Sequence, residues 1–122
     1  MLIGQSITAP AGTSQSDPHS VYYGPWAPRG GDAGNFLIEV MHISSSNCEV
    51  TAKVEHKNSE QADTSAAVVA TFSPDPITAI GTYKVQATGL KELVRYKYEL
   101  VGVNSVEEWA HLRANPPIWQ PN

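Results

Sequence analysis

Apolar and polar residues alternate without a break from Cys48 to His56. Side chains on a β-strand point to opposite faces at successive residues, so this pattern predicts a strand with one buried and one solvated face. The predicted buried face comprises Cys48, Val50, Ala52, Val54 and His56. The polar face, which we expect to be ordinary solvent-facing sheet, comprises Glu49, Thr51, Lys53 and Glu55.

Other segments of strand length follow the same pattern or form short apolar runs between turn residues. The predicted strands are residues 2–8, 36–43, 66–72, 83–88, 94–100 and 109–114. Residues 44–47, three serines and an asparagine, are expected to join strand 36–43 to strand 48–56 as a hairpin. Residues 106–112 could instead begin a short helix, since Glu107 and Glu108 suit a helix start, but we favour a strand there.

Two segments break the alternation. Residues 9–35 hold five of the nine glycines and four of the nine prolines, which excludes a continuous sheet, although Val21–Tyr23 can form a short strand. Residues 115–122 contain three prolines and are expected to form an extended tail. A long irregular segment in a compact chain is often functional or an extended arm.

Seven or eight short strands separated by turn signals are typical of an all-β fold. We predict a two-sheet antiparallel β-sandwich of jelly-roll or immunoglobulin-like kind. It would be a single domain over residues 1–122, with an irregular arm at 9–35 and an extended tail at 115–122.

Composition narrows the class of partner. Only 16% of the residues are charged, against roughly 25% in typical soluble proteins, which favours a surface partly covered by other subunits. The net charge of −4 and the scattered basic residues argue against nucleic-acid binding. No apolar run approaches the length of a membrane span, and we expect no signal peptide.

Candidate chemistry is sparse. The four histidines show no metal-ligand spacing, so we expect neither a metal site nor a cofactor. Cys48 lies in phase with buried valines and is interpreted as a small core residue rather than a nucleophile. Glu39 is the acid in the most apolar strand, and we expect Arg29 or Arg95 to pair with it. The sequence therefore favours a protein that is not an enzyme.

Two tryptophans lie among prolines, Trp26 between Pro25 and Pro28 and Trp119 between Pro117 and Pro121. Aromatic side chains in such restricted segments lose little conformational freedom on docking and make good anchors. Each can pack on its own sandwich, the alternative that we favour, or reach a neighbouring subunit. Exposed aromatics could also stack on sugar rings.

Residues 26–33, 57–60, 89–96 and 109–119 resemble landmarks of small all-β structural proteins of tailed phages, similar in kind to capsid decoration (cement) proteins. This resemblance concerns overall style across most of the chain and transfers no catalytic residue. It implies a module on a viral particle, often trimeric, with an arm or loop gripping the capsid.

From the residues and the resemblance we expect a non-enzymatic virion protein, made in the host cytoplasm, that binds and stabilises the capsid. Its partners would be the major capsid protein or other virion subunits, including further copies of itself. The alternatives are a carbohydrate-binding or receptor-binding module and, with least support, a small β-sandwich enzyme. The expected interface residues are Tyr22, Tyr23, Trp26, Arg29, Ile118 and Trp119.

Overall fold

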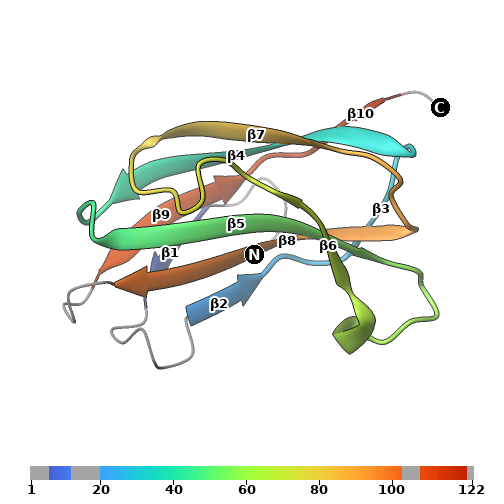
Figure 1. Ribbon diagram of the computed structural model, residues 1–122, viewed down its shortest axis with the longest axis horizontal. Coiled ribbons are helices and arrows are strands. Elements are labelled where there is room, and N and C mark those ends of the chain that lie inside the picture. The colour runs from blue at the N-terminus through green and yellow to red at the C-terminus, as the bar shows by residue number, and fades with distance from the viewer. Residues whose placement is uncertain (1–5, 12–19, 103–107, 121–122) are drawn as a thin grey trace.

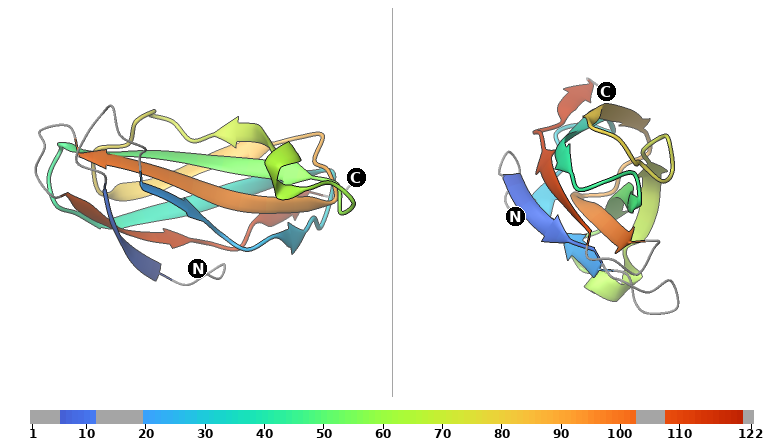
Figure 2. Two further views of the ribbon diagram at one scale, coloured as in Figure 1. Left: turned by 90° about the horizontal axis from the view of Figure 1, so that it is seen from below. Right: turned by 90° about the vertical axis from the view of Figure 1, so that its left-hand side faces the viewer.

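The protein is a sandwich of two antiparallel β-sheets packed face to face (Figure 1). The computed structural model describes residues 6–11, 20–102 and 108–120. Figure 2 shows the two layers from the side and from one end. The predicted all-β, two-sheet architecture is therefore confirmed. The beginning of the first predicted strand and the middle of the irregular N-terminal segment lie outside the described residues.

The first sheet is built around β4 (Ala33–Ile43). Strand β7 (Gly81–Ala87) pairs with one side of β4. The other side of β4 pairs with two strands in succession, β9 (Trp109–Ala114) along residues 38–43 and β10 (Ile118–Gln120) along residues 33–35. Strand β7 pairs with residues 34–40 and overlaps both, so it lies on the opposite side of β4 from them. Strand β1 (Ser6–Pro10) pairs with β9 and forms that edge.

The second sheet is built around the long pair β5 (Cys48–Lys57) and β8 (Leu93–Gly102). Their register is unbroken, from Cys48 opposite Gly102 to Lys57 opposite Leu93. Strands β2 (Ser20–Tyr23) and β3 (Ala27–Pro28) pair with the far side of β8. Strand β6 (Ala67–Thr71) pairs with β5 and forms the opposite edge.

The buried hydrophobic residues form one core between the sheets. The apolar side chains of the alternating strand, from Cys48 to Val54, lie in this core as predicted. The largest fully buried side chains are Tyr98, Phe36, Phe72, Ile38 and Ile77. Burying side chains of this size contributes roughly 1.5–3 kcal/mol each, which makes the contact between the sheets the main source of stability.

The predicted hairpin between β4 and β5 is wrong, because these strands belong to different sheets. The intervening segment is bonded instead to the start of β9. The Ser44 amide donates to the carbonyl oxygen of Trp109 at 2.9 Å. The hydroxyls of Ser44 and Ser45 both donate to the Glu108 carboxylate. This anchoring turns the chain from one sheet to the other, a non-local effect that a local turn signal does not contain.

The two irregular segments contain more strand than the sequence predicted. At its ends the 9–35 segment is sheet, because β1 extends to Pro10 and β4 begins at Ala33. The short strand predicted at Val21–Tyr23 is confirmed as β2. Residues 109–114 form a strand rather than a helix. The tail is not wholly polyproline-like, since residues 118–120 pair with β4 as β10.

Strand β6 is an edge strand that carries no charged residue. Its register against β5 skips one residue, because Val54 faces Ala70 whereas the next residue, Glu55, faces Val68. Val69 is therefore the extra residue of a β-bulge. A bulge bends an edge strand and interrupts its row of free backbone groups.

Candidate functional site

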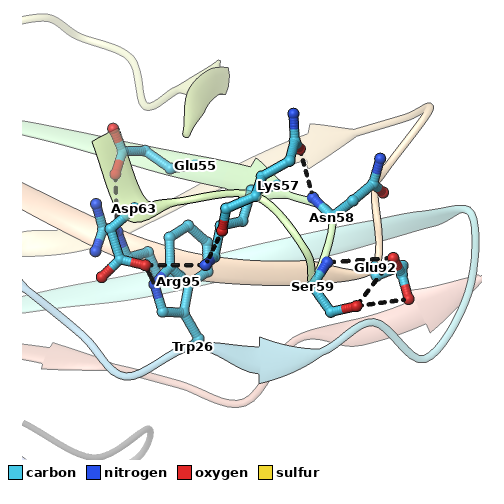
Figure 3. A network of polar contacts seen from close by, with 9 residues as sticks. Trp26, Glu55, Lys57, Asn58, Ser59, Asp63, Glu92 and Arg95 are labelled. Carbon is cyan, nitrogen blue, oxygen red and sulfur yellow. Dashed lines mark hydrogen bonds and ion pairs between the residues drawn. The ribbon is translucent and has the colours of Figure 1, made fainter. Parts of the chain in front are cut away.

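One cluster of rings and charges covers part of the outer face of the second sheet (Figure 3). We call it the aromatic–cation cluster. Its members come from β2, the segment after β2, β5, β8 and the short 3₁₀-helix η1 (Asp63–Ser65). They are Tyr23, Trp26, Glu55, Lys57, Asp63, Arg95 and Lys97.

The cluster corrects the expectation that the outer face of β5 is ordinary solvated sheet. Glu55 and Lys57 do point outward, opposite Arg95 and Leu93, but each whole residue, backbone included, is only 6% or 7% exposed. Trp26 and the η1 segment lie over this part of the sheet and exclude water from it (Figure 3). Alternation along the strand correctly identifies the face, but it carries no information on what covers that face.

Arg95 is the centre of the cluster. Its Nε donates a hydrogen bond of 2.8 Å to Oε1 of Glu55. The guanidinium carbon lies 4.0 Å from the ring centre of Tyr23 and 4.3 Å from that of Trp26. A planar, weakly hydrated guanidinium suits both contacts, because it stacks on aromatic faces while its N–H groups bind a carboxylate. Arg95 is thus fixed by a charge and two rings together.

A second set of contacts ties the strand-connecting segments together. Trp26 Nε1 donates to Oδ1 of Asp63 at 3.0 Å, and Lys57 Nζ lies 2.9 Å from the same oxygen. Lys57 also donates to the carbonyl oxygen of Gln61 and sits 5.1 Å from the centre of the Trp26 ring. The hydrogen bond from Lys57, with a smaller contribution from Trp26, lowers the pKa of Asp63. Asp63 therefore stays ionised and holds Trp26 in place at neutral pH.

A chain of ion pairs continues along the same face. Glu99 accepts from Lys53 at 3.2 Å and lies 3.2 Å from Lys97 Nζ, and Lys97 is 3.9 Å from Glu55. Burial alone would raise the pKa of Glu99, but the hydrogen bonds from Lys53 and Lys97 outweigh it and lower the pKa. Half of the eight basic residues lie here, each paired with an acid. Such a face does not attract phosphates as an unpaired basic groove would.

Two of the six expected interface residues come together in the cluster. Tyr23 and Trp26 share the Arg95 side chain, and Tyr23 is 48% exposed. Tyr22 points the other way on β2, packs against the core, and donates its hydroxyl hydrogen to the carbonyl oxygen of Pro10 at 2.9 Å. Adjacent residues of one strand face opposite sides, so Tyr22 and Tyr23 do not form one aromatic row.

The other three expected residues lie elsewhere. Arg29 forms a 2.8 Å ion pair with Asp32 and donates a hydrogen bond to the carbonyl oxygen of Leu90. Trp119 packs its ring edge-on against Phe36 of the same chain, with ring centres 5.8 Å apart. Ile118 points outward from β10 and is 71% exposed. The predicted set therefore divides between the two sheets.

The expected pairing of Glu39 with an arginine is wrong. Glu39 accepts a 3.0 Å hydrogen bond from the side-chain amide of Asn115, while Arg29 and Arg95 bind Asp32 and Glu55. Glu39 lies on the outer face of the first sheet, opposite Arg113 of β9. Arg95 lies on the outer face of the other sheet, so the core separates it from Glu39.

The structure brings together two histidines that are 69 positions apart in sequence. His42 and His111 face each other across β4 and β9, with nearly parallel rings whose centres are 6.1 Å apart. Sequence spacing could not reveal this pair, because a register shift after Val40 sets the pairing. Within the described residues no three or more His, Cys, Asp or Glu side chains are grouped as metal ligands. His19 lies outside those residues.

The remaining titratable groups of interest are held by burial or by local hydrogen bonds. Burial raises the pKa of the Cys48 thiol to about 11, with smaller contributions from Glu108 and Glu49. His56 points inward opposite Val94, and its Nδ1 accepts the Lys91 amide hydrogen at 3.2 Å. Burial, and then the charge of Lys91, lower the pKa of His56. These shifts favour an inert thiol and a neutral imidazole.

Comparison with protein-family models, with curated proteins and with solved structures gave no match. The part of the chain that the structure describes contains no detected pocket. No helix among those residues has the length and apolar character needed to cross a membrane. The geometry of the surface therefore carries the functional argument.

Proposed function

We propose that this protein is a non-enzymatic structural protein of a phage or phage-like virion that binds and stabilises the capsid shell. The observation that carries the proposal is the aromatic–cation cluster, a rigid group of tyrosine, tryptophan and arginine side chains on one outer face. These residue types are enriched at the energetic centres of protein–protein interfaces.

Pre-organisation supports a docking role for this face. Trp26 and Arg95 are held by Asp63 and Glu55, so little side-chain entropy remains to be lost when a partner binds. Next to them Val21 and Tyr23 project from β2 with 38% and 48% of their surface exposed. A partner that covers this edge would bury apolar area over a framework that is already fixed.

The charge pattern favours a protein partner. Because the cations of the cluster are paired with Glu55, Asp63 and Glu99, binding gains little from phosphate attraction. Contact with a protein surface buries Tyr23 and leaves these ion pairs intact within the chain. On a capsid the same modest contact repeats at every lattice position, and avidity compensates for limited affinity when the protein is itself oligomeric.

The test is attachment to particles purified from the native source material. Sedimentation should show the protein moving with the particles, and electron microscopy should show its density at regular lattice points. Tyr23→Ala should reduce occupancy at least tenfold, whereas Lys84→Ala, on the opposite sheet, should not. A protein that is strictly monomeric and free of every particle would refute the proposal.

The exposed ring of Tyr23 also suits a carbohydrate-binding or receptor-binding module, the second candidate. The rings of Trp26 and Trp119 are engaged by Arg95 and Phe36, which leaves them less available to a sugar. A glycan array separates the two functions. Saturable sugar binding that disappears in Tyr23→Ala, without particle attachment, would favour the second candidate.

A further inference from the structure

We infer that β10 is an exchangeable C-terminal arm, able to leave its own sandwich and occupy the equivalent site on a second copy of this chain. We use "arm" for residues 116–120 and "arm site" for the surface that holds them, formed by Gly30, Gly34, Phe36 and the backbone of residues 33–35. The inference concerns contacts between copies of the chain and does not depend on the proposed function.

The arm site is shaped for this particular segment. A Cβ atom at Gly30 would overlap the Trp119 ring, and one at Gly34 would lie 3.1 Å from Cε3 of that ring. A Cβ atom at Gly31 would likewise overlap the carbonyl oxygen of Gln120. The glycines thus leave the space that the indole and the backbone of β10 fill. Another copy of the same segment is the ligand that fits this site best.

The boundary between the sandwich body and the arm is sharp. Asn115 is held by three hydrogen bonds, in which its amide donates to Leu37, its side chain donates to Glu39, and its carbonyl oxygen accepts from Tyr96. The next two residues, Pro116 and Pro117, have no N–H group to bond to the body. The arm can therefore detach at this point without breaking the anchoring of Asn115.

The parts of the arm site named above belong to the segment between β3 and the middle of β4, far ahead of the arm in the chain. One further contact comes from β7, where the Gln86 side-chain amide donates to the side-chain oxygen of Gln120 at 3.0 Å. Removal of the arm consequently leaves the site in place. The arm itself pairs through only three residues and lies at the periphery of the sandwich (Figure 1). Exchange replaces these contacts with identical ones, which is why swapping of short elements is a low-cost route to association.

The composition of the arm also favours a second copy as the partner. Residues 114–122 include no charged side chain, so an incoming arm brings no side-chain charge into the site. In the closed form the arm meets its own site at an effective concentration of about 1 mM. Exchange between copies should therefore become extensive when the local protein concentration approaches that value.

The main test uses the double variant Asn35→Cys/Ile118→Cys, because these residues are direct partners across β4 and β10. Opposed residues of antiparallel strands lie about 4.5–5.5 Å apart at Cα, within the range that a disulfide spans. Copies labelled with ¹⁴N and ¹⁵N are mixed in equal amounts at about 1 mM, incubated and oxidised. Mass spectrometry then analyses the peptides that are joined by a disulfide between positions 35 and 118.

Exchange predicts hybrid peptides in which the disulfide joins a ¹⁴N segment to a ¹⁵N segment. At about 1 mM these hybrids should approach half of all disulfides between positions 35 and 118, whereas a micromolar mixture should give few of them. Ile118→Cys alone controls for random collisions. If the folded double variant yields only peptides of one isotope at both concentrations, the inference is wrong.

A second measurement applies if the double variant does not fold. Trp119→Ala vacates the arm site in the full chain, and a labelled peptide of residues 115–122 should bind it saturably. The same peptide with alanine in place of its tryptophan should not bind, nor should the wild-type peptide bind Trp119→Ala/Gly30→Val. Absence of binding to the vacated site up to about 1 mM would overturn the inference.

Discussion

At the scale of single residues, the outer face of the second sheet contains charges that are almost as buried as the core. Arg95 and Glu55 have side chains only 10% and 8% exposed. Two desolvated charges remain stable together because each satisfies the other and two rings cover the guanidinium. Removing one member of such a pair destabilises the protein more than replacing both with apolar residues, since the remaining charge stays buried without its partner.

Arg95→Ala should therefore lower the free energy of unfolding by about 3 kcal/mol, because it leaves the buried Glu55 carboxylate with the longer 3.9 Å contact to Lys97 and removes the stacking contacts. Urea denaturation followed by fluorescence measures the loss. Lys84→Ala, at an exposed position of β7, should change stability by less than about 0.5 kcal/mol. Glu55→Ala/Arg95→Ala should lose less than the sum of the single changes, and strict additivity would contradict the buried pair.

His56 makes stability depend on pH. Its pKa is lowered in the folded chain, so between the unfolded value of 6.5 and the lower folded value the unfolded state binds more protons. The contribution of neutral His56 is complete above pH 6.5 and declines as the pH falls toward the folded pKa. Asparagine keeps an acceptor near the Lys91 amide but does not titrate.

Denaturation curves at several pH values should therefore show wild type losing stability relative to His56→Asn as the pH falls below 6.5. NMR titration of the imidazole gives its folded pKa directly. A folded pKa at or above 6.5, or parallel pH profiles for the two proteins, would contradict this account.

At the scale of elements, the alternation of apolar and polar residues predicts the positions of strands well, but it predicts poorly which strands pair with one another. The alternation from Cys48 to Val54 identifies both the strand and its core face, because face alternation is local geometry. The hairpin across residues 44–47 fails because Glu108, more than 60 positions away, anchors Ser44 and Ser45. The sequence predicts Tyr23 and Trp26 as interface residues, but Arg95 joins them through the pairing of β2 and β3 with β8. No local pattern in the sequence encodes that pairing.

The docking of β10 can be tested through a glycine. Gly30→Ala should destabilise the chain by about 2 kcal/mol, because the added methyl group overlaps the Trp119 ring. In a Trp119→Ala background the same change should be nearly neutral, giving a coupling energy of about 1–2 kcal/mol. Chemical denaturation of the four proteins in the cycle measures it.

Gly89→Ala provides a contrasting control. Gly89 has a φ of 65° and open space around it, so its substitution strains the backbone alone. Its cost of about 1 kcal/mol should be the same with or without Trp119. Equal coupling for Gly30 and Gly89 would show that Trp119 does not occupy the site described.

At the scale of the whole molecule, Cys48 reports on the integrity of the sandwich. The side chain is fully buried between the sheets, and its pKa of about 11 leaves roughly one thiol in a thousand ionised at pH 8. Because both access and ionisation require the sheets to separate, its labelling should follow global unfolding.

A disulfide reagent should accordingly label native Cys48 slowly, at a rate that rises with urea in parallel with the unfolding equilibrium. Lys84→Cys introduces a second, exposed thiol into the same molecule. That variant should react in two phases, one fast and one as slow as wild type. Comparable rates for the two thiols would contradict the core position of Cys48.

The bulge at Val69 has a consequence for the behaviour of this protein in crowded solution. Residues 66–72 are uncharged and rich in β-forming side chains, a composition that promotes cross-β stacking when such a segment lies free. Strand β6 contains neither lysine nor proline, the residues that commonly prevent edge strands from pairing with other chains. The bulge at Val69 is the feature of β6 that opposes such pairing. We therefore predict that shortening β6 by this one residue would favour fibrils over dispersed molecules.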